Sequence, residues 1–547
     1  MRSHSIILAA CAAYIGVIMN IISTIFGTRR LYPRIRWLCA ALLAAVAFAA
    51  CDNPMVVTEV FPLSITPPHK TVYEIGEAFE TAGLEVYVSY GSHLAPVQNY
   101  TLTLNGNPIE NGNLIPLPGA YIVTVSVTDA AYGTRTSSFR ILVFGASNLT
   151  IANTSQWNAA LSQIRDRGDY QNYTITVSGN VPVPGSAANS FGTVSNITVT
   201  LQGNGKLYLT SQGNMIRLGD NQTLIIDGSG LTLEGLTNGI NGATQDNNTT
   251  VVYLNNGTAK LELHDGAITS NIASYGGGVH VGVGGSFTMS GGEISGNTVS
   301  SFGGGVYVGG GSFTMSGGEI FGNTASYGGG VDVGSSSYFT MSGTFVSSDG
   351  SFTMSGGDIS GNTASSSYHG GGGVSVSSGG SFTMSGGEIS GNTASSYGGG
   401  VCVDFWVIGT YGAFTMSGGK ISGNTSSYGG GVYVNGGSFM MSGGEISGNT
   451  ASSYGGGVYV DRNSFVAEEG GTFAKTDGTI YGYSAYDMVN SNVVKNNSGV
   501  VQNYKGHAVY ARTFDLVKIR EGTAGPGDNL SFNSRTDPPT ASGAWDN

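Results

Sequence analysis

Acidic side chains recur at one position of a repeated segment, and carboxylates are the groups that hydrolyse glycosidic bonds or bind Ca²⁺. The segment, SFTMSGGEISGNTASSYGGGV at residues 381–401, returns along the chain with small changes. Its acidic position is occupied in successive copies by Glu293, Glu319, Asp358, Glu388, Lys420 and Glu445, the Lys being the one exception. Because these residues are copies of one position, they predict a solvent-exposed ladder with a step of about 4.8 Å or its multiples. Calcium bridging along the ladder is an alternative, although the calcium-binding nonapeptide GGxGxD does not occur.

Other residues that carry chemistry are scarce in the repeats. Between residues 271 and 460 there is no Arg, one Lys, and two His in unrelated settings, His280 and His369. Lone histidines on an outer face are predicted to be solvated, and the NTD, GHG and RIK signatures of polygalacturonases are absent. The sequence therefore predicts no catalytic residue, no metal site and no cofactor, with a carbohydrate-active enzyme as the alternative.

Two further positions recur in the copies. Since buried amides must be paired, a recurring Asn predicts an internal ladder that hydrogen-bonds along the stack. Its members are Asn297, Asn323, Asn362, Asn392, Asn424 and Asn449. An aromatic residue precedes the glycines of each copy, and we call this set the aromatic row: Tyr275, Phe302, Tyr327, Tyr368, Tyr397, Tyr428 and Tyr454. The row is a candidate for stacking on sugar rings or docking a protein; alternatively, its rings pack on each other and stabilise the corner.

A framework with a constant period must hold these positions. Most Phe anchors of the copies are 25 to 32 residues apart, and one 13-residue step marks an insertion at 339–351. The anchors are Phe287, Phe313, Phe339, Phe352, Phe382, Phe414, Phe439 and Phe465. Each copy holds three strand-sized pieces, GVYV, SFTMS and EISGN, joined by glycines that adopt the φ > 0 of tight corners. This pattern predicts one coil of a parallel β-helix for about 26 residues.

Alternation within the pieces predicts which side chains point inward. In FTM, the Phe and Met are expected inside and the Thr outside. In VYV, the valines are expected inside, and the variable middle residue is expected to face solvent. We call this middle set the variable column: His280, Tyr307, Asp332, Ser375, Cys402, Tyr433 and Tyr459.

One amphipathic helix is predicted before the repeats, at 154–168. Thr154 or Ser155 is expected to cap it, Trp157, Leu161 and Ile164 to line its buried face, and Gly168 to end it. Upstream, residues 55–145 predict a β-sandwich, with strands at 84–90, 99–106, 120–129 and 136–144. The phrases YEIG and GLEV and the strand pattern resemble bacterial immunoglobulin-like modules of surface proteins, which implies a spacer.

The motifs GGGV and ISGN resemble the GGA[ILV] and FxxN repeats of polymorphic outer membrane proteins, with Gly for Ala and Ile for Phe. This resemblance implies a right-handed parallel β-helix of the pectin-lyase type on a bacterial surface. The expected fold is thus all-β: the immunoglobulin-like sandwich at 55–145, the β-helix at 146–495, and last irregular coils with a polar tail at 496–547.

The first fifty residues are predicted to be a leader. Residues 30–51 have a basic region, an apolar region and small residues before a cysteine, and the ending Phe48-Ala49-Ala50-Cys51 resembles a lipobox. Cys51 would then carry lipid, with residues 51–54 starting the anchor. Ordinary cleavage after Ala50 is one alternative. A membrane helix at 5–27 is another, because that apolar run is long enough to span a bilayer.

Charge and composition limit the partners. Only 10% of residues are charged, Gly accounts for 90 residues, and from Cys51 onward 17 bases stand against 34 acids. Such a chain repels phosphate backbones, so no nucleic-acid partner is expected. The sequence predicts an exported lipoprotein of the outer membrane, on the surface or the periplasmic face, that serves adhesion or display toward a glycan or protein; a structural envelope role is the alternative.

Overall fold

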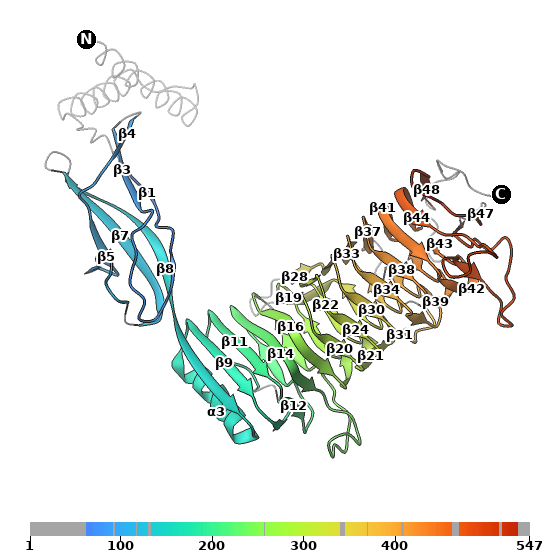
Figure 1. Cartoon of the computed structure of the whole chain (residues 1–547), viewed down its shortest axis with the longest axis horizontal. Coiled ribbons are helices and arrows are strands. Elements are labelled where there is room, and N and C mark those ends of the chain that lie inside the picture. The colour runs from blue at the N-terminus through green and yellow to red at the C-terminus, as the bar shows by residue number, and fades with distance from the viewer. Residues whose placement is uncertain are drawn as a thin grey trace, which may run out of the picture. The chain divides into compact units, whose positions relative to one another are not determined.

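The computed structural model describes residues 62–533, except 91–92, 116, 130–132, 187–188, 256, 340–344, 369, 406–409, 462–469 and 513–516. The predicted leader, Cys51 and the segment after residue 533 lie outside the described residues. Within the described ranges, the chain is all-β apart from one helix, and its strands stack in long parallel sheets (Figure 1). In this part of the chain, no helix has the length and apolar character needed to cross a membrane.

The N-terminal strands alternate buried and exposed residues as predicted. Val123, Val125 and Val127 of β7 are buried, and the residues between them are not. The strands are β1 (Leu63–Thr66), β2 (Val72–Glu74), β3 (Glu85–Tyr90), β4 (His93–Pro96), β5 (Thr101–Leu104), β6 (Asn107–Pro108), β7 (Gly119–Asp129) and β8 (Gly133–Ile151). Strand β8 continues past the predicted boundary at residue 145, and its Gly145–Ile151 part pairs in parallel with β9 (Gln171–Val177).

Helix α3 (Thr154–Arg167) lies between β8 and β9 in the sequence. Trp157, Leu161 and Ile164 are buried in the core of the first coils, as the 3.6-residue spacing predicts. The N-cap is Asn153 and not Thr154 or Ser155: the Asn153 side chain accepts a hydrogen bond from the N–H of Gln156. Thr154 instead donates its hydroxyl to the carbonyl of Pro182 at 2.6 Å.

Each repeated coil contributes strands to four rows, one more than the three pieces predicted. Two rows belong to one sheet. The SFTM row is β19 (Ser286–Met289), β23 (Ser312–Met315), β29 (Ser351–Met354), β33 (Ser381–Met384) and β37 (Ala413–Met416), and the EIS row is β20 (Glu293–Ser295), β24 (Glu319–Phe321), β30 (Asp358–Ser360), β34 (Glu388–Ser390) and β38 (Lys420–Ser422). Longer strands run through both rows at either end: β14 (Gln222–Glu234), β16 (Lys260–Thr269), β41 (Ser438–Ser447) and β44 (Thr472–Ile480).

The VYV strands form the third row. They are β13 (Ile216–Leu218), β15 (Val252–Leu254), β18 (Val279–Val281), β22 (Val306–Gly309), β26 (Val331–Gly334), β32 (Val374–Val376), β36 (Val401–Val403), β40 (Val432–Asn435), β43 (Val458–Asp461) and β46 (Val509–Arg512). The unpredicted fourth row follows the Asn of each coil: β17 (Ile272–Tyr275), β21 (Thr298–Phe302), β25 (Thr324–Ala325), β31 (Thr363–Ala364), β35 (Thr393–Ala394), β39 (Thr425–Tyr428), β42 (Thr450–Tyr454) and β45 (Val493–Val494). Coils begin before the repeats with β9, β10 (Asn180–Val183), β11 (Ile197–Gly203) and β12 (Lys206–Leu209).

Parallel pairing without register shifts places identical residues on top of each other in the SFTM row. Phe287 pairs with Phe313, and Phe313 with Phe352. Stacked rings from Phe287 to Phe439 have centroids 4.6–4.8 Å apart and planes within 6° of parallel. The Phe and Met of this row are buried, and the Thr between them points outward, as predicted. The repetition of the sequence is therefore the repetition of one core layer.

Two predicted anchors are not found in the stacked Phe row of the described residues. Phe339 belongs to an antiparallel hairpin of β27 (Ser336–Phe339) and β28 (Phe345–Ser348), which overlaps the insertion predicted at 339–351, and Phe313 pairs directly with Phe352. Phe465 lies outside the described residues, and Phe473 takes the anchor position opposite Phe439. At Phe339, an aromatic residue of the hairpin has the sequence spacing expected of a coil residue.

The solenoid continues past residue 495, since β46 pairs in parallel with β43. Its last coil is then covered by two antiparallel strands, β47 (Val517–Arg520) on β46 and β48 (Leu530–Asn533) on β44. Antiparallel pairing satisfies backbone groups that an open sheet edge would present to another chain. Helix α3 at the start and these strands at the end cap the stack.

Candidate functional site

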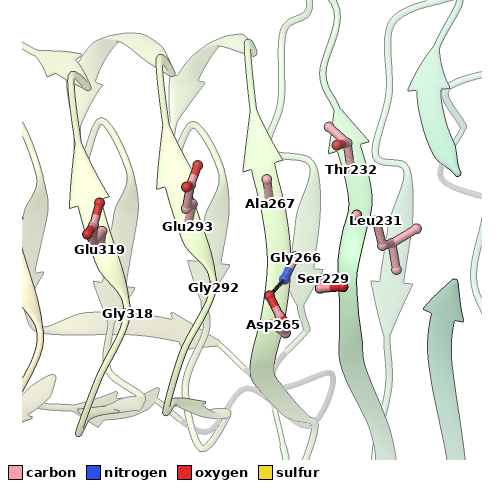
Figure 2. Close-up of a pocket in the computed structure, with 11 residues that line it drawn as sticks. Ser229, Leu231, Thr232, Asp265, Gly266, Ala267, Gly292, Glu293, Gly318 and Glu319 are labelled. Atoms are coloured by element: carbon pink, nitrogen blue, oxygen red, sulfur yellow. Dashed lines mark hydrogen bonds between the residues drawn. The ribbon is translucent and has the colours of Figure 1, made fainter. Parts of the chain in front are cut away.

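A groove of about 390 Å³ runs across four successive coils where the SFTM and EIS rows meet (Figure 2). Ser229, Gly230, Leu231 and Thr232 of β14, Asp265, Gly266 and Ala267 of β16, and Gly292, Glu293, Gly318 and Glu319 of the next two coils line it. Its direction is along the stack, so that each coil contributes the same few positions. An extended chain is the kind of ligand that such a groove fits.

Glycine backbone forms the floor of the groove because side chains would fill it. Gly292 and Gly318 have φ of 72° and 83°, in the region that residues with a Cβ rarely adopt. A Cβ on Gly292 would lie 2.7 Å from the carbonyl oxygen of Gly266, and one on Gly318 would lie 2.6 Å from that of Gly291. The GGE sequence thus keeps adjacent coils close and leaves the groove open.

Carboxylates stand on one wall of the groove. Glu293, Glu319 and Asp358 are direct neighbours in the register of the EIS row and are solvent-exposed, as the ladder prediction requires. Within the described part of the chain, their carboxylates make no hydrogen bond or ion pair. Two such charges about 5 Å apart in water repel by roughly 1 kcal/mol.

Two later members of this ladder have partners. Lys420 lies 3.3 Å from a carboxylate oxygen of Glu445, and the hydroxyl of Ser422 donates to Glu388 at 2.7 Å. Lys420 compensates the charge of Glu445, whereas Glu388 remains an anion, so the run of carboxylates without a countercharge in the described chain extends from Glu293 to Glu388. Figure 2 shows Glu293 and Glu319 on adjacent strands of the same wall, whereas glycoside hydrolysis needs two carboxyl groups that flank the scissile bond.

The recurring Asn residues lie in one fully buried line inside the solenoid. From Asn323 onward, each side-chain oxygen accepts from both the backbone N–H and the amide of the preceding Asn; for Asn392 as acceptor, the donors on Asn362 lie at 2.9 and 3.0 Å. The second amide hydrogen goes to an Ile carbonyl of the preceding coil, from Asn392 to Ile359 at 2.8 Å. The line extends beyond the six predicted members to Asn271 and Asn492.

The aromatic row is only partly exposed, because its rings lie over the variable column. Tyr397 and Tyr428 stack at 5.2 Å, and the Tyr397 ring lies 4.5 Å from that of Tyr433. Tyr454 lies 4.5 Å from Tyr510, which continues the column in the last coil. Tyr275, Phe302 and Tyr327 stack in the same way in the early coils, at 5.9 and 5.1 Å.

The prediction that the variable column faces solvent is wrong. Asp332, Cys402, Tyr433 and Tyr459 are at most 2% exposed, and Ser375 is 5% exposed. Cys402, Tyr433 and Tyr459 lie outside the main core, but Tyr397, Tyr428 and Tyr454 of the aromatic row pack on them and form a second, external apolar layer. Burial raises the pKa of the Cys402 thiol well above its usual value, so this residue is an unreactive core cysteine.

His280 is partly exposed and packs between two aromatic rings. Its ring centroid lies 4.8 Å from those of Tyr253 and Tyr307, and burial lowers its pKa to about 4. His369 lies outside the described residues. Tyr368 departs from the aromatic row, since it is 74% exposed. In the described ranges, no group of three His, Cys, Asp or Glu residues is arranged to hold a metal ion.

Comparison of the chain with protein-family models, curated proteins and solved structures found no match. The assignment of function therefore depends on the geometry alone. Of the features described, the groove was not predicted from the sequence. The signal for it was present in the GGE triplet, because two adjacent glycines beside a recurring acid leave a corner without side chains.

Proposed function

We propose that this chain is a non-enzymatic lipoprotein of the cell envelope that displays a right-handed parallel β-helix for adhesion, and that its groove binds an extended glycan. The observation that carries the proposal is the groove itself, which crosses four coils along the stack and is lined by glycine backbone, hydroxyls and carboxylates. Backbone and hydroxyl groups are suited to hydrogen-bond sugar hydroxyls, and Glu293 and Glu319 are register neighbours in one row of strands.

Charge selects among glycans. The unpaired carboxylates of Glu293 and Glu319 repel uronic acids and sulfated sugars at this short distance, so that neutral or amine-bearing polymers are the expected ligands. This preference also separates the proposal from a pectate-active enzyme, whose substrate is itself a polyanion. Because the groove lies on paired strands of the stack, binding of a ligand should cost the protein little conformational entropy.

In this proposal, the lipid anchor and the N-terminal strands attach the β-helix to the membrane. Lipid on Cys51 would hold the chain at the outer membrane, and an immunoglobulin-like spacer at 55–145 would separate the β-helix from that membrane. The alternation of buried and exposed residues in β7 supports a sandwich-type unit. Right-handed coils are the hand that parallel crossover connections almost always take.

A glycan array combined with turnover assays tests the proposal. The double variant Glu293→Gln/Glu319→Gln alters the groove, and Glu110→Gln/Asp166→Asn removes the same charge from an exposed loop and from helix α3. We expect binding of neutral or amine-bearing linear glycans without turnover, a loss of at least tenfold in the groove variant, and no loss in the control.

Three results would contradict the proposal in different ways. Release of reducing ends or unsaturated products would show an enzyme. Binding of no glycan by the intact chain would favour a structural envelope role or a protein ligand. Equal loss in both double variants would show a non-specific effect of net charge, not a site in the groove.

A further inference from the structure

The last coil of the solenoid ends in backbone N–H groups that point onward along the stack. In the coil before it, the N–H of Gly456 donates to the carbonyl of Gly506 in the last coil. His507 lies opposite Gly456, because β46 continues the register of β43. The N–H groups of Gly506 and His507 therefore point beyond the last coil, where another acceptor must satisfy them.

Two side chains supply the acceptors that carbonyls of a further coil would otherwise supply. The carboxylate of Glu521, directly after β47, accepts from the N–H of Gly506 at 3.0 Å and from that of His507 at 3.4 Å. The Nδ1 atom of the His507 ring accepts from the N–H of Val494 in β45 at 2.9 Å. We call His507 and Glu521, with these three hydrogen bonds, the terminal clasp, because they join the last coil to the segment that covers it.

The hydrogen bond from Val494 determines where the His507 ring carries its proton. A donor that faces Nδ1 requires a lone pair on that atom, so the proton of the neutral ring is on Nε2. Nε2 lies 3.3 Å from Oε2 of Glu521, although it has no hydrogen-bond partner within the described residues. The His507 side chain is 3% exposed, so the closed clasp shields both nitrogens from water.

Glu521 is the charged group that lies against the His507 ring. The ring of Tyr483, from the segment between β44 and β45, lies 5.2 Å away. Lys505 donates to a tyrosine hydroxyl of the preceding coil at 2.9 Å, and Arg520 donates to backbone carbonyls of the turn that follows it. A second proton on the ring would thus meet one carboxylate at Nε2 and an N–H donor at Nδ1.

We infer that the terminal clasp is an acid-released latch, in which protonation of His507 at Nδ1 breaks the hydrogen bond from Val494 and loosens β47 and β48 from the last coil. Once Nδ1 carries a proton, two donors face each other at the distance of the former hydrogen bond. The ring must then move, and because the N–H of His507 is itself a donor to Glu521, this movement also disturbs the contact with the covering segment. The device does not depend on the glycan groove, which earlier coils form.

The direction of the pH effect follows from the closed geometry. The closed clasp needs the neutral ring: burial lowers the pKa of His507, and the opposing effect of Glu521 is smaller. An opened, solvated His binds a proton near its ordinary value of 6.5. The clasp therefore contributes its full stability above pH 6.5. Below this value the opening equilibrium rises by at most about tenfold per pH unit, and it levels off below the pKa of the closed state.

Hydrogen exchange with mass spectrometry at pH 7.5 and 5.5, corrected for the intrinsic pH dependence of exchange, tests this on the purified chain. At the lower pH we expect peptides of β45 and β46 to lose protection by up to about tenfold, and peptides of β32 and β36 to keep theirs. His507→Asn keeps an acceptor oxygen close to the position of Nδ1 but does not titrate, so this variant should stay protected at both pH values. His264→Asn, which removes a partly exposed His from β16, is the matched control and should keep the pH response.

His507→Gln supplies a second variant. Its longer side chain places the amide oxygen beyond the position of Nδ1, so β45 and β46 should be poorly protected at both pH values. The inference is overturned if these strands are equally protected at both pH values in the unaltered chain. It is equally overturned if both His507 variants retain the pH response of the unaltered chain.

Discussion

Replacing Asn392 with Leu tests whether the buried amides hold the coils together. Its side-chain oxygen accepts from the N–H and the amide of Asn362, and its own amide donates to Ile359 and Asn424. Leu has a similar branched shape but no polar atom. Asn362 would therefore keep two buried donors without an acceptor, at about 1–3 kcal/mol each, so that the loss of stability is about 2–6 kcal/mol.

Thr383→Val in the same coil is the matched control. Thr383 is solvent-exposed in the SFTM row, and loss of its hydroxyl leaves no buried group unpaired. A control at Ser375, which the sequence alone would favour, is unsuitable because Ser375 is buried beside Asp332. We expect Thr383→Val to change stability by less than about 0.5 kcal/mol, as is usual for surface substitutions.

Urea unfolding monitored by circular dichroism measures the total effect, and hydrogen exchange localises it. Because each coil contacts only its neighbours, the loss of protection should be greatest in β30, β34 and β38 and fade along the stack. Equal midpoints for the two variants would refute the argument. Such a result would mean that the amide ladder fills space without contributing hydrogen-bond energy.

Cys51→Ser should move the protein from membranes to the soluble fraction on cell fractionation; continued membrane association would instead make the 5–27 segment the anchor. Deletion of Ser381–Gly412 removes one coil and brings β29 opposite β37 in the same register, so the shortened chain should fold and be about 4.8 Å shorter by small-angle scattering. Loss of the β signal in circular dichroism would show that the coils are not modular. Cys402 should resist iodoacetamide at pH 8 in the native state and react on unfolding, because burial raises its pKa; peptide mass spectrometry of rapid native labelling would reveal the contrary.

The sequence was sufficient to predict the coil because the coil repeats. The inward Phe and Met, the outward Thr and the buried face of helix α3 all follow from local periodicity, which depends only on backbone geometry. The Asn positions were also identified from the sequence, since a polar residue that returns at one place in every copy marks a layer of the stack. Phe339 was wrongly predicted to be an anchor because periodicity does not distinguish a coil residue from an aromatic residue in a hairpin.

Only the tertiary structure determined which side chains on the outer surface of the coils are buried and where a groove forms. Alternation in VYV correctly predicts that the side chains of Tyr433 and Tyr459 lie outside the main core. Whether other residues cover them depends on the conformation of the preceding corner, which places Tyr428 and its neighbours over them. The groove is likewise a property of four coils in register, which no single copy of the repeat contains. Asp332 shows the consequence clearly: strand geometry predicts this position to be exposed, but its side chain is buried in the folded chain, and burial raises the pKa of its carboxyl to about 7.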